Sequence, residues 1–383
     1  MNIIFYSTPA FGHINPSLAL CSAIAQRHHL TVYSSSEFES VFNGVCENFI
    51  PYDFSNISFD MTIGDKLIDL SELLLRFTVQ NIDSFLSDAL KLSPDVIIYD
   101  TLALWGRSVG MILNQKRKLK TVSINAFSAV HSKRTKAFGM YIASISPALI
   151  RQLGSLSSVM QSRKVLRNQY GVEPVDFMSV IMNPADYNVY TYPQCLHPDG
   201  FTLANNYFFL GPTACKRDTY QVENYPFDNI IYVSLGTIFN NNDAFWQAVI
   251  DQFGNTKYNV IMACMDKADK YRAISDCDNI HIYEYVNQRA VLSSAKAFIS
   301  CGGMNSICEA ASFGVPCVLY PQQSEQNMNA TMFARNGFGV KIKHISSLYN
   351  VTDDLINKYH VDEQKNNCFK QTYIREFVNL IEK

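Results

Sequence analysis

The chain has 383 residues, of which 48% are hydrophobic and 17% are charged, and its formal net charge at pH 7 is −2. This length allows two domains, each large enough to bury a core of its own. Nucleic acid is excluded as an expected partner, because a phosphate backbone needs an excess of Lys and Arg that this composition lacks. The ten cysteines are scattered without metal-ligand spacing, so we expect neither a disulfide nor a structural metal.

We expect neither a signal peptide nor a membrane span. Residues 1–6 lack the basic region and the long apolar region of a signal peptide, and no uncharged apolar run approaches the ~20 residues of a membrane span. The apolar segment 138–156 is broken by Ser and Pro, and we expect it to form helices that line a pocket. We therefore predict a cytoplasmic protein without stable membrane insertion. No oligomeric state is predicted.

The first half of the chain alternates predicted strands and helices. Residues 3–6 form an apolar run that leads into a glycine-containing loop, and residues 16–27 carry apolar side chains at helical spacing. Further strands are predicted at 31–34, 94–100 and 121–124. The continuous apolar core of 94–100 is typical of a parallel strand buried on both faces. This pattern indicates an α/β doubly wound half, with ligands at the carboxyl ends of the strands.

The second half repeats the pattern after a polar, turn-forming stretch at 211–218. A strand and its loop are predicted at 230–237, with further strands at 259–263, 297–299 and 317–320. The fold class is therefore α/β, with two Rossmann-like domains facing each other across a cleft. The predicted boundaries are 1–210 for the N-terminal domain, 211–228 for a linker, 229–365 for the C-terminal domain, and 366–383 for a helix that packs back toward the N-terminal domain.

The strongest functional signal lies in residues 300–309, where a strand runs into Gly302 and Gly303 and then into a polar helix start. Glycines let the backbone approach a ligand closely, and a helix N-terminus presents N–H groups and the positive end of a dipole. Asn305 and Ser306 can add side-chain donors. The pattern predicts a diphosphate site. An ordinary capped helix after a glycine turn would explain the two glycines alone, but not the acidic and amide residues that follow.

A histidine and an aspartate follow two predicted strands of the first half. His13 comes after the first strand and beside Gly12, and Asp100 ends the strand at 94–100. Both therefore lie where a doubly wound sheet presents its ligands. A lone histidine is more often structural, and Asp100 can also be the N-cap of a helix that starts near Leu102.

With these motifs the sequence resembles the nucleotide-sugar-dependent glycosyltransferases of family 1, which have the GT-B fold, and in particular their macrolide-glycosyltransferase-like bacterial branch. The resemblance covers nearly the whole chain. It implies that the first half binds the acceptor, that the second half binds the donor, and that His13 is the catalytic base held in position by Asp100. His13 would take the proton of an acceptor hydroxyl, whose oxygen attacks the anomeric carbon opposite the leaving nucleotide, and the product is inverted.

The same resemblance implies the donor contacts. Glu309 is expected on the ribose hydroxyls, Glu325 and Gln326 on the sugar hydroxyls, Thr237 on a phosphate, and Tyr285 on the face of the base. The complete set of expected donor-binding residues is Gly12, Ser234, Gly236, Thr237, Tyr285, Val286, Gln288, Cys301, Gly303, Asn305, Ser306, Glu309, Glu325 and Gln326.

Two positions depart from the family pattern. Asn287 replaces a proline in the segment after Tyr285, a change expected to be tolerated because proline contributes a fixed φ. Cys301 replaces a phosphate-binding histidine, and a thiol is a weak hydrogen-bond donor. The alternative for Cys301 is packing against its strand neighbours.

The resemblance also implies a reaction without a metal or a cofactor. Helix-end N–H groups, Thr237, Asn305 and Ser306 would meet the charge of the leaving group, and we expect no Asp-x-Asp metal motif in the chain. The donor is expected to be a UDP-hexose, with UDP-glucose first, and it is a co-substrate. Glu325 and Gln326 favour a fully hydroxylated sugar, because a deoxysugar would leave them unsatisfied.

The acceptor is expected to be a small hydrophobic molecule such as a natural product. The segments that shape the acceptor pocket in relatives carry large apolar side chains, and ordinary core packing is the alternative for each one. These residues are Phe77, Phe85, Phe127, Phe138, Met140 and Tyr141. The nearby Lys133, Arg134 and Lys136 could contact an anionic acceptor or a lipid, although such a run is usually a solvated helix face.

Two other functions stay open from the sequence. One is a lipid-directed transferase of the same fold that acts at a membrane surface. The other is a pseudoenzyme that binds a nucleotide sugar or a partner protein without turnover. Cys301 supports the pseudoenzyme, whereas His13 and Asp100 argue against it.

Overall fold

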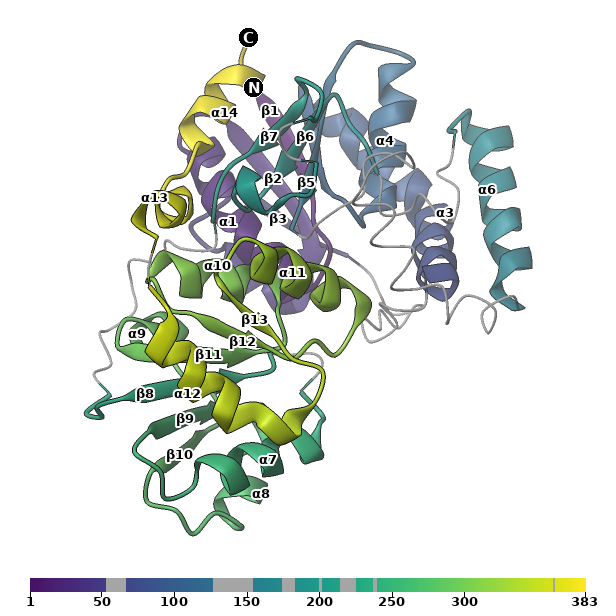
Figure 1. Ribbon diagram of the computed structural model, residues 1–383. Helices are drawn as coiled ribbons and strands as arrows, with labels where there is room; N and C mark the ends of the chain where they lie inside the picture. The colour runs from purple at the N-terminus through teal and green to yellow at the C-terminus, as the bar shows by residue number, and fades with distance from the viewer. Residues whose placement is uncertain are drawn as a thin grey trace. The chain divides into compact units, whose positions relative to one another are not determined.

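The structure is a computed structural model that describes residues 1–52, 67–126, 154–173, 183–199, 202–213, 225–236, 240–360 and 362–383. The chain forms two compact units (Figure 1). Unit 1 consists of Met1–Cys215 and Thr372–Lys383, and unit 2 of Lys216–Gln371. The passage from unit 1 to unit 2 therefore falls inside the predicted linker, and the C-terminal helix belongs to unit 1.

The described part of unit 1 contains a seven-stranded parallel sheet in the order β3-β2-β1-β4-β5-β6-β7. This order reverses between β1 and β4, which is the switch point of a doubly wound sheet. The central strands are almost entirely buried, as their continuous apolar sequences predict. The strands are β1 (Asn2–Tyr6), β2 (His29–Ser35), β3 (Asn48–Tyr52), β4 (Val96–Asp100), β5 (Lys120–Asn125), β6 (Tyr187–Tyr190) and β7 (Tyr207–Phe209).

Helices cover both faces of this sheet (Figure 1). The C-terminal helix α14 packs beside α1, and Phe377 joins Phe5, Ile14 and Ile98 in one hydrophobic cluster. On the other face α4 approaches β1 and β4, and α3 packs against α4 and α6. The helices are α1 (Phe11–Ala25), α2 (Glu39–Phe42), α3 (Leu67–Leu92), α4 (Leu104–Asn114), α6 (Leu156–Tyr170) and α14 (Ile374–Ile381).

Unit 2 repeats the architecture with a six-stranded parallel sheet in the order β10-β9-β8-β11-β12-β13. Its switch point lies between β8 and β11. The strands are β8 (Ile230–Ser234), β9 (Asn259–Ala263), β10 (Ile280–Tyr283), β11 (Ala295–Ser300), β12 (Cys317–Leu319) and β13 (Gly339–Lys341). The helices are α7 (Asp243–Phe253), α8 (Ala268–Arg272), α9 (Gln288–Leu292), α10 (Met304–Ser312), α11 (Ser324–Arg335), α12 (Leu348–Lys358) and α13 (Glu363–Asn366).

Short 3₁₀ segments complete the two units. They are η1 (Ser36–Phe38) and η5 (Gln194–Leu196) in unit 1, and η6 (Met265–Lys267), η7 (Ile345–Ser347) and η8 (Asn367–Phe369) in unit 2. The predicted fold class, two Rossmann-like α/β domains, is confirmed by the two sheets.

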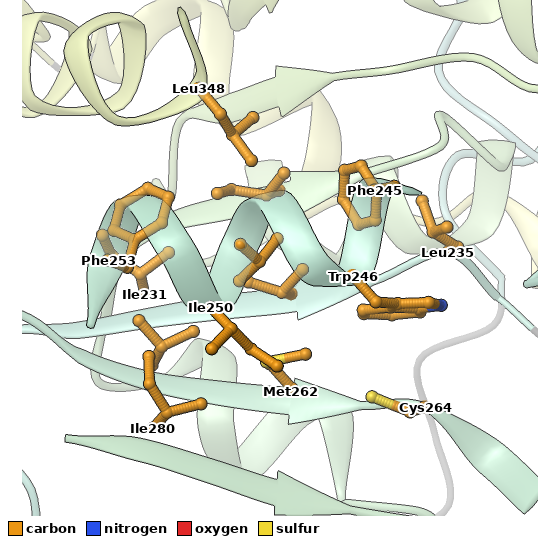
Figure 2. Close-up of a cluster of buried hydrophobic side chains, with 14 of the residues drawn as sticks. Ile231, Leu235, Phe245, Trp246, Ile250, Phe253, Met262, Cys264, Ile280 and Leu348 are labelled. Carbon is orange, nitrogen blue, oxygen red and sulfur yellow. The ribbon is translucent and has the colours of Figure 1, made fainter. Parts of the chain in front are cut away.

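The core of unit 2 lies between α7 and the sheet (Figure 2). Trp246 and Phe245 are completely buried there with Met262 of β9. The indole N–H of Trp246 donates to the main-chain oxygen of Asn240 at 2.9 Å, so its polar atom is satisfied inside the core. Asn242 caps α7 by accepting from the N–H of Phe245 at 3.1 Å. These contacts fix the end of the loop that leaves β8.

Gly106 sets how closely α4 approaches the sheet beneath the unit 1 switch point. A Cβ at this position would lie 2.7 Å from Cβ of Tyr6 and 2.8 Å from Cβ of Tyr99. Neither atom can move without its strand. We predict that Gly106→Ala lowers the free energy of unfolding by about 2 kcal/mol, as overpacking does. Chemical denaturation followed by circular dichroism measures the change.

A matched control is available in Gly154, where a Cβ would have no atom within 4 Å. Gly154→Ala should change the free energy of unfolding by less than about 0.5 kcal/mol. Equal stability of both variants would mean that α4 does not lie this close to the sheet.

Candidate functional site

The unit 1 switch point brings His13 and Asp100 together. His13 lies in the first turn of α1, directly after the β1 loop, and Asp100 is the last residue of β4. Nδ1 of His13 is 2.8 Å from Oδ2 of Asp100, and the two side chains are 12% and 2% exposed. The sequence analysis paired these two residues, which are 87 positions apart. In the structure they form a direct, largely buried hydrogen bond.

Two further donors hold the second oxygen of Asp100. The Thr8 hydroxyl donates to Oδ1 at 2.6 Å, and the main-chain N–H of Leu102 donates to the same atom at 2.9 Å. A buried carboxylate needs such donors to offset its lost hydration. The N-cap of α4 is Ala103, so the bond to Leu102 belongs to the loop and Asp100 is not the helix cap that the sequence offered as an alternative.

This geometry fixes the proton of the imidazole ring. An ionised carboxylate can only accept hydrogen bonds, so the contact with Asp100 places the proton of neutral His13 on Nδ1 and the lone pair on Nε2. Nε2 is therefore the basic atom. Gly12, next to it in the chain, is exposed, and a Cβ there would have no atom within 4 Å.

The unit 2 switch point carries the glycine loops that the sequence predicted for a diphosphate. Gly236 follows β8 with φ +80, and Gly302 follows β11 with φ +91, so both positions need glycine. Gly303 is the N-cap residue of α10 and gives no side-chain cap, and a Cβ there would meet no atom within 4 Å. The first N–H groups of α10 are thus presented at the carboxyl edge of the sheet, as an anion site requires.

Asn305 and Ser306 lie in the first turn of α10 and are half-buried. Ser234 is the last residue of β8, and its hydroxyl accepts from the N–H of Gly236 at 3.3 Å. These residues therefore gather around the same two loops. Thr237, the predicted phosphate contact next to Gly236, lies outside the described residues.

Cys301 packs in the core instead of facing outward. It is 4% exposed and belongs to the hydrophobic cluster of unit 2, and its thiol donates to the main-chain oxygen of Leu235 at 3.1 Å. Burial raises the pKa of this thiol to about 11, so it stays protonated at neutral pH. Its single hydrogen is used within the fold. This corrects the expectation that Cys301 offers a donor to the diphosphate, and the arrangement is the packing alternative.

The segment after β10 places the predicted nucleoside contacts. Tyr285 is 68% exposed, whereas Val286 is buried. Asn287, which replaces the family proline, caps α9 by accepting from the N–H of Ala290 at 3.2 Å. The substitution therefore adds a helix cap where proline would only restrict φ.

Glu309 is held by a side chain from the same segment. Nε2 of Gln288 donates to Oε2 of Glu309 at 2.5 Å, and the Tyr232 hydroxyl donates to Oε1 of Gln288 at 3.3 Å. Burial raises the pKa of the Glu309 carboxyl, and the bond from Gln288 opposes that shift. The residue expected on ribose hydroxyls is thus a positioned carboxylate.

Glu325 and Gln326 begin α11 directly after the β12 loop. Oε1 of Glu325 accepts from Nδ2 of Asn329 at 2.6 Å. Oε1 of Gln326 accepts from the N–H of Gln322 at 2.8 Å, and Gln326 is only 5% exposed. Gln326 thus shapes the loop before α11, while the half-buried Glu325 is the more accessible of the pair.

The acceptor-binding predictions fall partly outside the described residues, which exclude Phe127, Phe138, Met140 and Tyr141. Phe77 and Phe85 of α3 are 0% and 6% exposed. Phe77 packs edge-on against Trp105 at 4.7 Å between ring centroids, and Phe85 against Tyr52 at 5.6 Å. Both side chains serve as core packing in this structure, so their contact with an acceptor stays a prediction.

An Asp-x-Asp triplet does occur, at residues 276–278, outside the donor motifs. Asp276 and Asp278 are exposed and precede β10, which places them at the amino edge of the unit 2 sheet. The donor loops leave the carboxyl edge of that sheet. Within the part of the chain that the structure describes, no three His, Cys, Asp or Glu side chains gather as metal ligands.

Sequence reasoning missed two residues that hold the site together, Thr8 and Asn329. Thr8 stands two residues after a predicted strand, where a hydroxyl can face the ligand edge of the sheet. Asn329 follows Glu325 by four residues on a helix, which places both side chains on one face. The place of Thr8 after the strand and the four-residue spacing between Glu325 and Asn329 were the sequence signals that could have identified these two residues.

Comparison with known proteins agrees with this arrangement. A family model for the glycosyltransferase family 28 C-terminal domain matches residues 235–381. The chain is 28% identical to the NDP-glycosyltransferase YjiC of Bacillus licheniformis, covering 90% of this chain and 85% of that protein. It is 23% identical to a demethyllactenocin mycarosyltransferase of Streptomyces fradiae, covering 93% and 81%.

Solved structures share the fold of the whole chain. The glycosyltransferase of kitacinnamycin superposes with a TM-score of 0.82 at 21% identity, covering 99% of this chain and 98% of that one. The calicheamicin glycosyltransferase CalG4 gives 0.74 at 20% identity, covering 100% and 94%. The chain is thus similar over nearly its whole length to glycosyltransferases, and it shares the fold of these solved structures. No helix among the described residues is long and apolar enough to cross a membrane.

Thr8 offers a test of how the candidate site holds Asp100. Thr8→Val keeps the shape and removes one of three donors to the carboxylate, so the hold on His13 loosens. We predict about a tenfold fall in kcat for sugar transfer, since a hydrogen bond to a charged group contributes about 1.5–3 kcal/mol. Steady-state kinetics measures it. Thr8→Ser restores the donor and should stay near the wild-type rate, and a folded Thr8→Val enzyme with unchanged kcat would contradict the assignment.

Proposed function

We propose that this chain is an inverting, metal-independent transferase that moves a hexose from a UDP-sugar to a hydroxyl of a small hydrophobic acceptor. UDP-glucose is the proposed donor, and a natural product is the proposed kind of acceptor. The observation that carries this proposal is the buried His13–Asp100 hydrogen bond at the unit 1 switch point. This hydrogen bond orients His13 as the base that takes the proton of the attacking hydroxyl.

The names of similar proteins support a nucleoside diphosphate donor and a natural-product acceptor. Two relatives from Bacillus subtilis, 26% and 22% identical, are named as uncharacterized UDP-glucosyltransferases. The similar structure of spinosyn rhamnosyltransferase SpnG was solved with thymidine diphosphate and also with a spinosyn aglycone. A nucleotide diphosphate and a largely apolar acceptor are thus the ligand classes to test first.

In the proposed reaction, Nε2 of His13 takes the proton of the acceptor hydroxyl as its oxygen attacks the anomeric carbon. The positive charge that forms on the ring faces Oδ2 of Asp100, and the other carboxylate oxygen, Oδ1, is already held by Thr8 and Leu102. The carboxylate therefore needs no rearrangement during the step, which is the benefit of preorganised electrostatics. Attack opposite the leaving nucleotide inverts the anomeric centre.

The nucleoside diphosphate leaves with its charge on the phosphate oxygens. In this proposal the uncapped N-terminus of α10, with Asn305 and Ser306, supplies N–H and side-chain donors to that charge. Cys301 is left out of this step, because its thiol donates to Leu235. A metal ion is not required where oriented dipoles already meet the charge.

The pseudoenzyme alternative rested on Cys301, and the buried position of Cys301 in the core removes that support. Its support was the loss of a phosphate-binding side chain, whereas α10 presents main-chain N–H groups that do not depend on residue 301. The basic residues behind the lipid-directed alternative, Lys133, Arg134 and Lys136, lie outside the described residues. Neither alternative has a described contact in its favour.

We predict that His13→Ala lowers the transfer rate by at least about a thousandfold, because the general base is lost. The dissociation constant of UDP should stay within about twofold, since the expected donor residues other than Gly12 belong to unit 2. His29→Ala, at an exposed histidine of unit 1, is the matched control and should leave both quantities unchanged. Rates come from product chromatography and affinities from calorimetry. A comparable loss of UDP affinity in His13→Ala would remove His13 from the role of base.

The donor prediction is tested in buffer that contains EDTA. We expect transfer from UDP-glucose under these conditions, and a kcat/KM at least about a hundredfold lower with a TDP-deoxysugar, because Glu325 would lose a hydroxyl partner. Full activity with the TDP-deoxysugar and none with UDP-glucose would refute the donor. Activity that is lost in EDTA and restored by magnesium or manganese would refute metal independence.

A further inference from the structure

One buried amide joins two parts of the donor site. Asn329 of α11 is completely buried. Its Nδ2 donates to Oε1 of Glu325 at 2.6 Å and to the main-chain oxygen of Gly302 at 3.2 Å. Both N–H groups of one amide are thus used, one on a carboxylate and one on the glycine loop. The contact with an anion is short, as charge-assisted hydrogen bonds are.

The glycine loop also packs tightly against the start of α11. A Cβ at Gly302 would lie 3.1 Å from the main-chain oxygen of Gln326 and 3.5 Å from Cβ of Ala330. The loop therefore rests on the helix that carries Glu325. Asn329 is the side chain that adds a hydrogen bond to this packing, and it ties the loop carbonyl to the carboxylate itself.

We propose that Asn329 is a positioning residue that fixes the Glu325 carboxylate relative to the Gly302 loop, and thereby sets how much the hexose contributes to donor binding. This inference rests on the proposed function, because it takes Glu325 as the sugar contact and the loop as the diphosphate contact. In a nucleotide sugar the diphosphate and the hexose are joined by one bond. The groups that bind them must therefore keep a fixed spacing.

A Glu side chain on a helix has several rotamers, and only some of them direct the carboxylate at one place. The bond from Asn329 selects one position before the ligand arrives, so binding does not have to order the side chain. A nucleotide without a sugar does not use Glu325 in this scheme. The loss of Asn329 should therefore weaken UDP-glucose and spare UDP.

The experiment is calorimetric titration of the full chain with UDP and, separately, with UDP-glucose. The quantity compared is the ratio of the Kd for UDP-glucose to the Kd for UDP. Asn329→Leu removes both donors without adding charge, and we expect this ratio to rise about tenfold, with UDP itself changing less than about threefold. Asn327→Leu makes the same replacement on the same helix outside this network and should leave the ratio unchanged.

A double-mutant cycle separates positioning from a general structural role. Glu325→Gln raises the ratio by itself, and adding Asn329→Leu to it should raise the ratio no further, because the anchored carboxylate is already gone. If Asn329→Leu does not fold, Asn329→Asp keeps the shape and loses both donors. If the charge of the new aspartate weakens UDP and UDP-glucose equally, the ratio of their Kd values does not change.

Equal weakening of both ligands, an unchanged ratio, or an additive cycle would overturn the inference while the proposed function stands. Failure of the wild-type chain to bind either ligand would overturn the proposed function, and the role of Asn329 with it.

Discussion

Both units depend on one constraint, the reversal of strand order in a parallel sheet. At the reversal, two neighbouring loops leave the sheet in opposite directions. Their backbone groups therefore do not hydrogen-bond to each other and stay accessible to a ligand. In unit 1 these loops follow β1 and β4 and meet in the His13–Asp100 hydrogen bond. In unit 2 they follow β8 and β11 and hold Gly236 and Gly302. Each compact unit thus builds one functional centre from the same topology.

One carboxylate in each centre is held by hydrogen-bond donors of the fold itself. Asp100 accepts from Thr8, Leu102 and His13, so both oxygens have partners. Glu325 accepts from Asn329 in a comparable way. A carboxylate that is fixed by donors loses little entropy on binding and keeps its field aimed at one place. Residues such as Thr8 and Asn329, which are not expected to contact a substrate, therefore determine how precisely Asp100 and Glu325 are positioned.

The sequence predicted the central strands and the pairing of His13 with Asp100, but not the other contacts that orient this pair. Central strands are continuously apolar, so β1, β4, β8 and the 297–299 part of β11 stand out. Four of the missed strands, β3, β7, β10 and β13, are sheet edges; β3 contains Pro51 and is partly exposed, and β7 and β13 have three residues each. The missed β6 lies inside its sheet but has only four residues. The Thr8–Asp100 bond joins residues 92 positions apart across two loops. No local pattern encodes such a distance.

The two departures from the family pattern show why residue type alone misleads at a binding loop. Asn287 gives up the fixed φ of proline but accepts a hydrogen bond from Ala290, so the start of α9 is stabilised by another route. Cys301 gives up a charged donor, and its thiol turns inward to Leu235 because a small, polarizable side chain is more stable in the core than in water. Neither change touches the N–H groups at the start of α10. Main-chain donors are fixed by the glycine turn and by the helix, so they remain in place through side-chain changes that would abolish a site made of side chains alone.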